Sequence, residues 1–584
     1  MKNLAVLIDA ADLVSFDFFD TLFMRDLLNP EDVFDIIGNK YSIRNFRAFR
    51  IEAQIEAFRR MHIAGRHEIS LAGIYDCMPD LGIDGKTLMD AELKVEFEVA
   101  RPNVEMMDAW RYAKKLNKLV AITSDMYLPA SYFNMVLNKH GIICQNLLIS
   151  SELNATKRDT GALYDVLCDI FPFACGKVLH IGDNPVSDVQ RAREKGLSAF
   201  HYIEIRKPIR YQSSTTEASI ASAMIRRYKD LIPLGSFKEF GFIHGGPATV
   251  AYLDWLRERF REDRIKHVLF MSRDSYSLHA LVNESPMIGF PSNCYFFGSR
   301  TAFNMAAINT ENFGEYIEFL LSGASGLSPH EIFERIGVNP PSDKVFDDAK
   351  IFGLYTSEQR NEWVMFLFSM KNEILQICHR NRRALFNYLH QIGVRDGDRI
   401  ALVDIGWNGT SQDGFERAVK ELFDIEVFGY YFSLTDSFEC NDRKMKYSMT
   451  AMFSSENFEL DMIKKIYPAR LLAELLFSAP HGTVIGWGVS PTGDIVSIED
   501  LRGANSDNLS RISASIFEGV QMFAAGMNDF RARVELDISP LALGQLLVDE
   551  MIDGMWVHDK KIQSIHGFDA WGYSINRELL IHDY

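Results

Sequence analysis

Four short segments in the first third of the chain carry acids, hydroxyls and a lysine directly after apolar runs. The residues concerned are Asp17, Asp20, Thr21, Ser124, Asp125, Lys157, Asp183 and Asp188. A carboxylate can attack phosphorus or bind a hard divalent cation, whereas a lysine and hydroxyl groups can hold the equatorial phosphoryl oxygens. If the fold brings these residues together, the set can surround one phosphate and one divalent cation.

The segments that precede these residues have the composition of buried strands. Strand-type apolar runs span 13–17, 118–124, 146–151, 177–182 and 198–203. Helical periodicity separates them, from about Pro30 to Leu116 and over 159–171 and 190–196. This alternation predicts a parallel, doubly wound α/β sheet, in which chemistry collects at the carboxyl ends of the strands.

The ordered set resembles the haloacid dehalogenase (HAD) superfamily of hydrolases over roughly residues 10–205. Its four motifs correspond to Asp17 with Thr21 and Leu22, then Ser124, then Lys157, then Gly182-Asp183 with Asp188. The resemblance implies a HAD-like Rossmannoid sheet with a helical cap over about 25–108. It implies Asp17 as nucleophile, with Thr21, Ser124, Asp125 and Lys157 as substrate contacts. It also implies Mg²⁺ held by Asp17, the Phe19 carbonyl, Asp183 and Asp188.

The sequence is also similar to a HAD subgroup written FDxFDTL with a later SDMYLP, here residues 124–129. That subgroup is associated with bacterial cell-surface polysaccharide loci. One residue departs from the superfamily pattern, because Phe19 stands where an aspartate usually acts as general acid and base. A phenyl ring cannot donate a proton. Asp20, one residue later, is either the substitute acid or a turn former.

The remainder of the chain predicts a connector over 206–234 and a second α/β domain over 235–584, with a helical tail. Strand-type runs lie at 267–271, 294–297, 399–404 and 427–434, and long helical stretches at 357–392 and 508–557. Two loops that follow strands, 272–275 and 404–410, carry polar residues that define a possible second site: Arg273, Asp274 and Asp404, with Arg300 nearby. The second loop weakly resembles the acidic loop of phosphoribosyltransferases. A tight turn with structural arginines explains both loops equally well.

Length and charge limit the classes of function. The 584 residues are enough for two large domains, and 62 lysines and arginines against 79 acids give a net charge of −17. Nucleic acid and anionic membranes are therefore not expected partners. The seven cysteines contain no CxxC pair, and the amino terminus is not a signal peptide. These features predict a reduced, cytoplasmic protein.

The leading hypothesis is a Mg²⁺-dependent phosphohydrolase that acts on a small phosphorylated metabolite, possibly a sugar phosphate, through an aspartyl-phosphate. Asp17, Asp20 and Lys157 are its expected catalytic residues. Phe19 leaves open a second hypothesis, in which a HAD-like module binds a phosphorylated ligand without turnover. The Asp404 loop leaves open a third, a bifunctional protein with a transferase-like carboxyl-terminal domain.

Overall fold

The computed structural model describes most of the chain in atomic detail. The described residues are 2–172, 174–204, 215–229, 231–284, 290–322, 329–339, 357–499, 506–563, 565–567 and 579–580. They form two compact units. The first holds Met1–Leu231 with Ala525–Ile538, and the second holds Ile232–Ala524 with Ser539–Tyr584.

These units differ from the predicted division into 1–205, 206–234 and 235–584. Helix α11 (Thr216–Tyr228), which falls within the predicted connector, belongs to the first unit because it packs on α2 (Asp32–Lys40). A short segment from near the carboxyl terminus also belongs to the first unit. The rest of the predicted connector, residues 205–214 and 230, lies outside the described residues.

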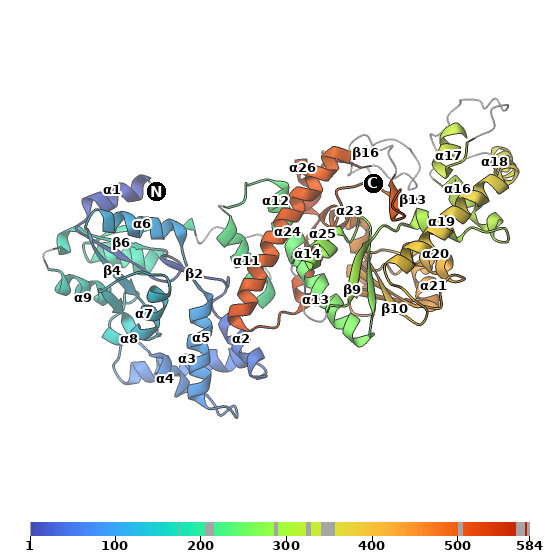
Figure 1. Cartoon of the computed structure of the whole chain (residues 1–584). Helices are drawn as coiled ribbons and strands as arrows, with labels where there is room; N and C mark the ends of the chain where they lie inside the picture. The colour runs from blue at the N-terminus through green and yellow to red at the C-terminus, as the bar shows by residue number, and fades with distance from the viewer. Residues whose placement is uncertain are drawn as a thin grey trace. The chain divides into compact units, whose positions relative to one another are not determined.

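A five-stranded sheet forms the centre of the first unit (Figure 1). Its order is β5-β4-β1-β6-β7, with β1 at Leu13–Phe16, β4 at Leu119–Ser124, β5 at Leu147–Ile149, β6 at Val178–Gly182 and β7 at Ser198–His201. All of its pairings are parallel. This confirms the predicted α/β class, and it places the carboxyl end of β1 between those of β4 and β6.

Helices cover both faces of this sheet. Leu13 of β1 packs in one cluster with Leu163 and Leu167 of α9 (Ala162–Ile170). Phe16 points to the opposite face, where its ring centroid lies 5.3 Å from that of Trp110. The other helices around the sheet are α1 (Lys2–Ala10), α6 (Val104–Lys115), α7 (Ala130–Lys139), α8 (Ser150–Leu153) and α10 (Arg191–Glu194).

Four helices inserted between β2 (Phe23–Arg25) and β3 (Ala100–Pro102) form the cap. They are α2, α3 (Phe46–Ile63), α4 (Leu71–Tyr75) and α5 (Gly85–Val99). Inside the cap, the fully buried Arg50 and Glu92 form two hydrogen bonds of 2.7 Å. The insertion is shorter than the predicted 25–108, because α6 packs on β4 of the central sheet.

The end of α24 (Ser506–Val534) and the residue after it contact the linker that follows β2 and the cap helices α2 and α5. Arg533 Nη2 donates to Asp26 Oδ2 at 2.7 Å, and Arg533 Nη1 donates to the carbonyl of Glu98. Asp26 follows β2 and Glu98 precedes β3. Glu535 pairs with Lys40 of α2 at 2.8 Å. We name Arg533 and Glu535 the linker clamp, since together they join the linker after β2 to two helices of the cap.

Replacing Arg533 by alanine should lower the free energy of unfolding by about 1.5–3 kcal/mol, because the buried Asp26 loses a charge-assisted hydrogen bond. Urea unfolding would measure the change. Arg111→Ala is the matched control, since Arg111 pairs with Asp108 at the surface and its loss should cost at most about 1 kcal/mol. Equal stability of the two variants would mean that Asp26 does not depend on the linker clamp.

The second unit contains another five-stranded sheet, with order β12-β11-β10-β8-β9 and parallel pairing throughout. Its strands are β8 (His267–Met271), β9 (Ser292–Phe296), β10 (Arg399–Asp404), β11 (Glu426–Ser433) and β12 (Ser448–Phe453). The sequence predicted the first four, which confirms a second α/β domain. It missed β12, whose residues SMTAMF contain few β-branched side chains.

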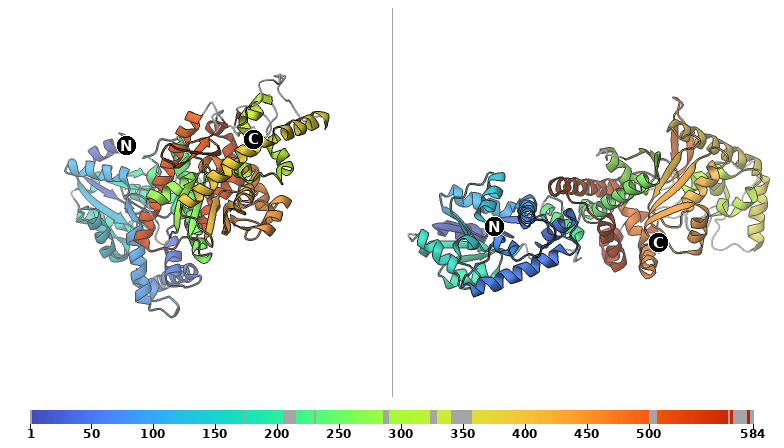
Figure 2. Two further views of the ribbon diagram at one scale, coloured as in Figure 1. Left: turned by 45° about the vertical axis from the view of Figure 1, so that its right-hand side comes forward. Right: turned by 90° about the horizontal axis from the view of Figure 1, so that it is seen from below.

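Helices and a hairpin surround the second sheet (Figure 2), and a second antiparallel pair joins β15 (His566–Gly567) to β16 (Leu579–Leu580). The helices are α12 (Phe237–Phe240), α13 (Gly246–Glu262), α14 (Tyr276–Glu284), α15 (Arg300–Ala307), α16 (Ile317–Leu321), α17 (Pro329–Ile336), α18 (Ser357–Ser369), α19 (Lys371–Gln391), α20 (Thr410–Val419), α21 (Phe438–Lys446), α22 (Leu460–Ile466), α23 (Arg470–Leu476), α25 (Pro540–Asp553) and α26 (Lys560–Gln563). The hairpin pairs β13 (Val484–Val489) with β14 (Ile495–Glu499). The predicted stretch 508–557 corresponds to α24 and α25.

Two further observations bear on the predicted environment. Among the described residues, no helix combines the length and the apolar character that crossing a bilayer would need. Cys168 is disulfide-bonded, which differs from the fully reduced state that the scattered cysteines predicted.

Candidate active site

The carboxyl edge of the first sheet brings the predicted residues together. Asp17 follows β1, Ser124 ends β4, and Asp183 follows β6. Lys157 comes from the loop between α8 and α9. Its ammonium nitrogen lies 2.9 Å from Asp17 Oδ1 and 2.5 Å from Asp188 Oδ1. One buried lysine therefore joins the proposed nucleophile to the acid of the fourth motif.

The two carboxyls that contact Lys157 have opposite electrostatic environments. Burial raises the pKa of Asp17 above its ordinary value, and Lys157 only partly offsets this. Burial would also raise the pKa of Asp188, but Lys157 and a hydrogen bond from His180 outweigh it and hold this pKa well below its ordinary value. Asp188 is therefore the ionised partner that holds Lys157 in place near neutral pH.

The turn after β6 is shaped around the Asp188 carboxylate. Asp188 Oδ2 accepts a hydrogen bond from the backbone N–H of Asn184 at 2.9 Å, and Asn184 Oδ1 in turn accepts from the N–H of Val186. A Cβ atom on Gly182 would lie only 2.3 Å from the Asp188 carboxyl carbon. Only glycine fits at position 182, because the carboxylate occupies the space of a side chain.

Three buried polar side chains inside the strands extend this network, and the sequence prediction missed them. Ser15 Oγ lies 2.8 Å from Thr123 Oγ1 and 3.0 Å from His180 Nδ1. His180 Nε2 lies 3.2 Å from Asp188 Oδ1. Burial lowers the pKa of His180, so the neutral ring donates from Nε2 to the carboxylate. Polar residues within apolar strands were the available signal, since a buried polar group needs a partner.

Asp125, a predicted substrate contact, positions the lysine loop. Its two carboxylate oxygens accept the backbone N–H groups of Lys157 at 2.8 Å and Arg158 at 2.9 Å. Both carboxylate oxygens of Asp125 therefore already accept hydrogen bonds from the protein's own backbone.

The ring of Phe19 packs beneath the guanidinium group of Arg25. The Arg25 guanidinium carbon lies 3.7 Å from the Phe19 ring centroid, and Arg25 donates to both carboxylate oxygens of the buried Glu96, at 2.9 and 3.2 Å. Phe19 is only 9% exposed, with the ring of Phe18 4.9 Å away. The position of the usual acid and base is thus filled by an apolar ring and a paired cation.

Asp20 and Thr21 follow in the same turn. Asp20 has a left-handed backbone (φ 56°), a conformation that aspartate tolerates better than most residues. Thr21 is fully buried, and within the described residues its hydroxyl has no hydrogen-bond partner. An unsatisfied hydroxyl four residues after Asp17 is a donor that a bound phosphoryl oxygen would satisfy.

The cap contacts the core beside the lysine loop. Arg158 donates to both carboxylate oxygens of the buried Glu68, each at 2.8 Å. Tyr127, in the SDMYLP segment, packs against the cap cluster of Ala53, Ala57, Met61, Ile69 and Ile74. Asp17 is 9% exposed in this arrangement. The cap therefore contacts the core beside Lys157, close to the carboxyl edge of the first sheet.

The residues present fit a divalent cation. Carboxylate oxygens of Asp17, Asp183 and Asp188 all lie within 4.8 Å of one another. Lys157 supplies one positive charge to the two acids that it contacts, so negative charge remains in excess. Hard oxygen donors of this kind are those that Mg²⁺ prefers. Since Lys157, His180 and Asn184 already engage Asp188, Asp17 and Asp183 are the better placed ligands. The Phe19 carbonyl remains a predicted third ligand.

The predicted second site lies at the carboxyl ends of the strands of the second sheet. Arg273 and Asp274 follow β8, Asp404 ends β10, and Arg300 begins α15. Burial and the nearby Asp274 raise the pKa of Asp404 to about 8. The same two causes raise the pKa of Glu474 on α23 to about 7. β8 and β10 are neighbours from which the chain proceeds in opposite directions across the sheet, a position where α/β proteins commonly bind ligands.

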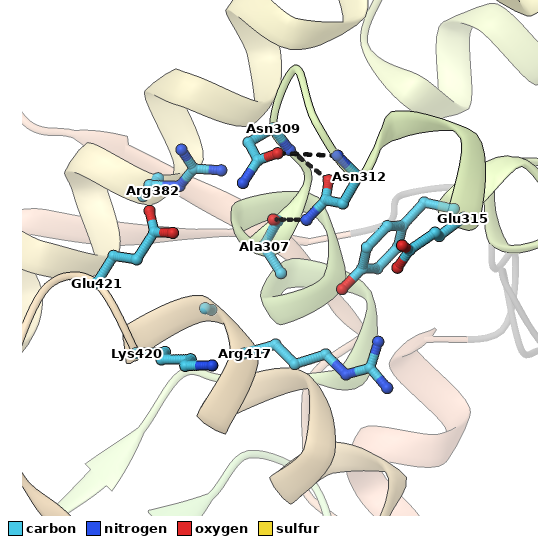
Figure 3. Close-up of a pocket in the computed structure, with 10 residues that line it drawn as sticks. Ala307, Asn309, Asn312, Glu315, Arg382, Arg417, Lys420 and Glu421 are labelled. Atoms are coloured by element: carbon cyan, nitrogen blue, oxygen red, sulfur yellow. Dashed lines mark hydrogen bonds between the residues drawn. The ribbon is translucent and has the colours of Figure 1, made fainter.

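A cavity of about 240 Å³ lies elsewhere in the second unit (Figure 3). Arg382, Arg417 and Lys420 contribute cations to its lining, and Asn309 and Asn312 exchange two hydrogen bonds at its rim. Arg382 is occupied by the carbonyls of Ala306 and Ile308. None of the predicted site residues lines this cavity.

Comparisons with known proteins concern about a third of the chain. No protein-family model matches the sequence. No curated protein matches it either. Among solved structures, a HAD phosphatase from Thermococcus onnurineus shares 15% identity over 38% of this chain and 97% of its own, with a TM-score of 0.25. A 2-haloacid dehalogenase from Pseudomonas syringae pv. Tomato DC3000 shares 16% identity over 38% and 99%, with a TM-score of 0.25. A hydrolase from Streptococcus pneumoniae TIGR4 shares 12% identity over 33% and 93%, with a TM-score of 0.22.

Proposed function

We propose that the first unit is a Mg²⁺-dependent phosphohydrolase of HAD type that acts on small phosphate esters. The observation that carries this proposal is the buried lysine held between Asp17 and Asp188 at 2.9 and 2.5 Å, beside the Asp183 carboxylate. This is an arrangement of nucleophile, cation and metal ligands around one point. Phosphoryl transfer needs this combination of groups, whereas a pocket that only binds a ligand does not.

In the proposed reaction, an Asp17 carboxylate oxygen attacks phosphorus while the bond from phosphorus to the ester oxygen breaks. The product is an aspartyl-phosphate, and the departing oxygen takes its proton from water, since Phe19 has none to give. Water then cleaves the aspartyl-phosphate and regenerates the carboxylate with release of phosphate. Lys157 neutralises negative charge on the equatorial phosphoryl oxygens, and the hydroxyls of Thr21 and Ser124 donate hydrogen bonds to the same oxygens.

Asp17 and Asp183 would hold Mg²⁺, with the Phe19 carbonyl as a further ligand and Asp188 fixing Lys157 beside them. When bound, the ion supplies positive charge that favours the ionised form of Asp17 and neutralises phosphate oxygens. The position of the cap favours small substrates over phosphorylated polymers.

Phosphate release from a panel of esters tests the proposal. The panel should include an aryl phosphate, several sugar phosphates and a phosphoprotein, each with Mg²⁺ and with EDTA. We expect Mg²⁺-dependent release, fastest from the aryl phosphate and slowest from the phosphoprotein. Ligand binding by calorimetry with no release from any substrate would favour the alternative of a ligand sensor.

Phe19→Asp should restore acid catalysis only weakly. The new carboxylate would lie close to the Arg25 guanidinium, which stabilises the ionised form and lowers the pKa of this side chain. We expect a gain for alkyl phosphates well below the factor of about 10²–10⁴ that a positioned acid can supply. Steady-state rates on an alkyl and an aryl phosphate would measure it.

A triple variant combines Phe19→Asp with Arg25→Met and Glu96→Met. It removes the guanidinium charge beside position 19 without leaving Glu96 as an unpaired buried acid. This triple variant should gain more on the alkyl ester than the single variant does, and the aryl ester should change little. Arg25→Met with Glu96→Met alone is the matched control for packing. A full gain from Phe19→Asp by itself would contradict the effect assigned to Arg25.

The bifunctional alternative is favoured by one observation, the convergence of Asp274, Asp404 and Glu474 at the reversal point of the second sheet. If this edge binds its own ligand, Asp404→Ala should keep phosphate release by the first unit. Calorimetric titration with a nucleotide sugar and with phosphoribosyl pyrophosphate would then show binding to the native protein alone. Native protein that binds neither compound would leave the loops with a structural role.

A further inference from the structure

Three polar side chains form a layer across the first sheet, next to its carboxyl edge. They are fully buried and come from neighbouring strands, and we name them the polar layer: Thr123 of β4, Ser15 of β1 and His180 of β6. Two positions earlier in the same strands, the side chains on the same face are apolar and pack in one cluster with α9: Ala121, Leu13 and Val178. This face therefore changes from apolar to polar at the layer that adjoins the candidate active site.

The hydrogen bonds of the polar layer run in one direction, toward Asp188. An ionised carboxylate can only accept, so the contact of 3.2 Å with His180 requires the ring proton on Nε2. Nδ1 of the neutral ring then accepts from the Ser15 hydroxyl at 3.0 Å, and Ser15 Oγ accepts from Thr123 at 2.8 Å. The series of donors therefore ends on Asp188 Oδ1, the same oxygen that accepts from Lys157 at 2.5 Å.

The contacts around His180 restrict its ring to one orientation. Its centroid lies 5.0 Å from that of Tyr164, in an edge-to-face arrangement. The Tyr164 hydroxyl donates to the carbonyl of Ser187 at 2.8 Å, directly before Asp188. Since paired buried polar groups can be replaced by apolar groups of the same shape with little loss of stability, stability alone does not require a polar layer here. What the polar layer adds is a fixed donor at the Asp188 carboxylate.

The ammonium group of Lys157 has two acids within reach. It lies 2.9 Å from Asp17 Oδ1 and 2.5 Å from Asp188 Oδ1, at the end of a flexible side chain. An ammonium that paired with Asp17 alone would hold the attacking oxygen in an ion pair and lie away from the phosphoryl oxygens. A fixed Asp188 carboxylate opposes this rearrangement, because it keeps the ammonium between the two acids.

We propose, resting on the phosphohydrolase function above, that Ser15 and His180 are positioning residues for phosphoryl transfer. They hold the Asp188 carboxylate, and through it the Lys157 ammonium, where the equatorial phosphoryl oxygens bind. They act from inside the sheet, and the bonds made and broken stay those already given. The effect falls on the transition state, since a misplacement of about 1 Å can cost on the order of 10²-fold in rate.

Steady-state kinetics on an aryl phosphate with Mg²⁺ test the proposal. His180→Leu removes the donor to Asp188 and should lower kcat about 10- to 100-fold with little change in KM, the range for a hydrogen bond to a charged group. His180→Gln supplies an amide N–H in place of Nε2–H and should recover most of this loss. Ser15→Ala removes the donor to Nδ1 that fixes the tautomer, and it should lower kcat about 3- to 10-fold.

Inhibition by orthovanadate gives a second readout, because this anion adopts the five-coordinate geometry of the transferring phosphoryl group. We expect its inhibition constant to rise in each variant by about the same factor as kcat/KM falls. Inhibition by inorganic phosphate should change less. Thermal unfolding would set an assay temperature at which every variant is folded.

Ser513→Ala is the matched control for the loss of a buried serine hydroxyl. Ser513 belongs to the second unit, is 2% exposed, and donates to the Ser478 carbonyl at 2.7 Å, so its loss should lower stability without changing kcat.

Three results would each overturn the proposal. They are kcat within twofold of the native value in folded His180→Leu and Ser15→Ala, equal losses in His180→Leu and His180→Gln, and unchanged inhibition by orthovanadate. If His180→Leu does not fold, Ser15→Ala decides alone. Release from no ester by the native protein would instead reject the phosphohydrolase function, and the proposal with it.

Discussion

Replacing Asp17 by asparagine should abolish phosphate release from every substrate, with a loss on the order of 10⁴-fold or more, as expected for removal of a nucleophile. The amide is nearly isosteric with the carboxyl but cannot form an acyl phosphate by the same attack. Because burial already disfavours the charged form of Asp17 in the metal-free protein, the neutral side chain should be tolerated. Steady-state rates and unfolding midpoints would be measured together.

Asp12→Asn provides a matched control for the same change. Asp12 precedes β1, is half exposed, and pairs only distantly with Lys177 at 3.6 Å. It should retain the native rate. If Asp17→Asn kept a rate within tenfold of the native protein while remaining folded, Asp17 could not be the nucleophile.

Replacing Lys157 by methionine should lower the free energy of unfolding by about 3–5 kcal/mol at pH 8, the cost of removing one partner from a buried ion pair. Lys157 is 1% exposed and is the shared partner of Asp17 and Asp188, so both acids would be left in a site with little water. Phosphate release should be lost as well, because the transferring oxygens lose their cation. Chemical denaturation in EDTA would measure the stability without interference from a metal.

The loss of stability caused by Lys157→Met should depend on pH, because the two carboxyls that Lys157 contacts can be protonated. In the native protein, Lys157 and His180 hold the pKa of Asp188 below its ordinary value of 3.8, so this acid contributes stability above about pH 4 that is lost on further acidification. Without Lys157, both buried carboxyls would have raised pKa values and would take up protons as the pH falls. The deficit of the variant should therefore shrink between pH 8 and pH 5.

Lys195→Met is the corresponding surface control. Lys195 pairs with Asp165, whose side chain is 53% exposed, and its loss should cost less than about 1 kcal/mol at any pH in this range. A Lys157→Met deficit that is no larger than the control, or that grows on acidification, would contradict the buried ion-pair network.

The strands were predictable because their apolar runs are short and end in polar residues. LVSF, LVAITS and VLHIG each coincide with a strand to within about a residue. The placement of Asp17, Ser124 and Asp183 at one edge then follows from parallel pairing alone. The roles of Asp125 and Asp188 did not follow, because their hydrogen bonds join residues from separate loops whose approach no local pattern encodes.

Long-range contacts account for what the sequence did not predict. The linker clamp joins Arg533 to Asp26 across 507 residues, so no window of sequence reveals that α24 ends in the first unit. The network of Ser15, Thr123 and His180 was visible only as polar residues inside strands. Arg25 over Phe19 is similar, since an arginine at the end of β2 carries no sign of the ring it will cover. These contacts depend on the assembled fold.

The most direct test of the account is to trap the phosphorylated enzyme. The native protein would be quenched in acid during Mg²⁺-dependent turnover of an aryl phosphate, digested, and examined by mass spectrometry. The account predicts a phosphoryl group, removable by hydroxylamine, on Asp17 in the peptide that contains it, and none in Asp17→Asn. Steady phosphate release with Asp17 unmodified, or with the phosphoryl group on another residue, would contradict it.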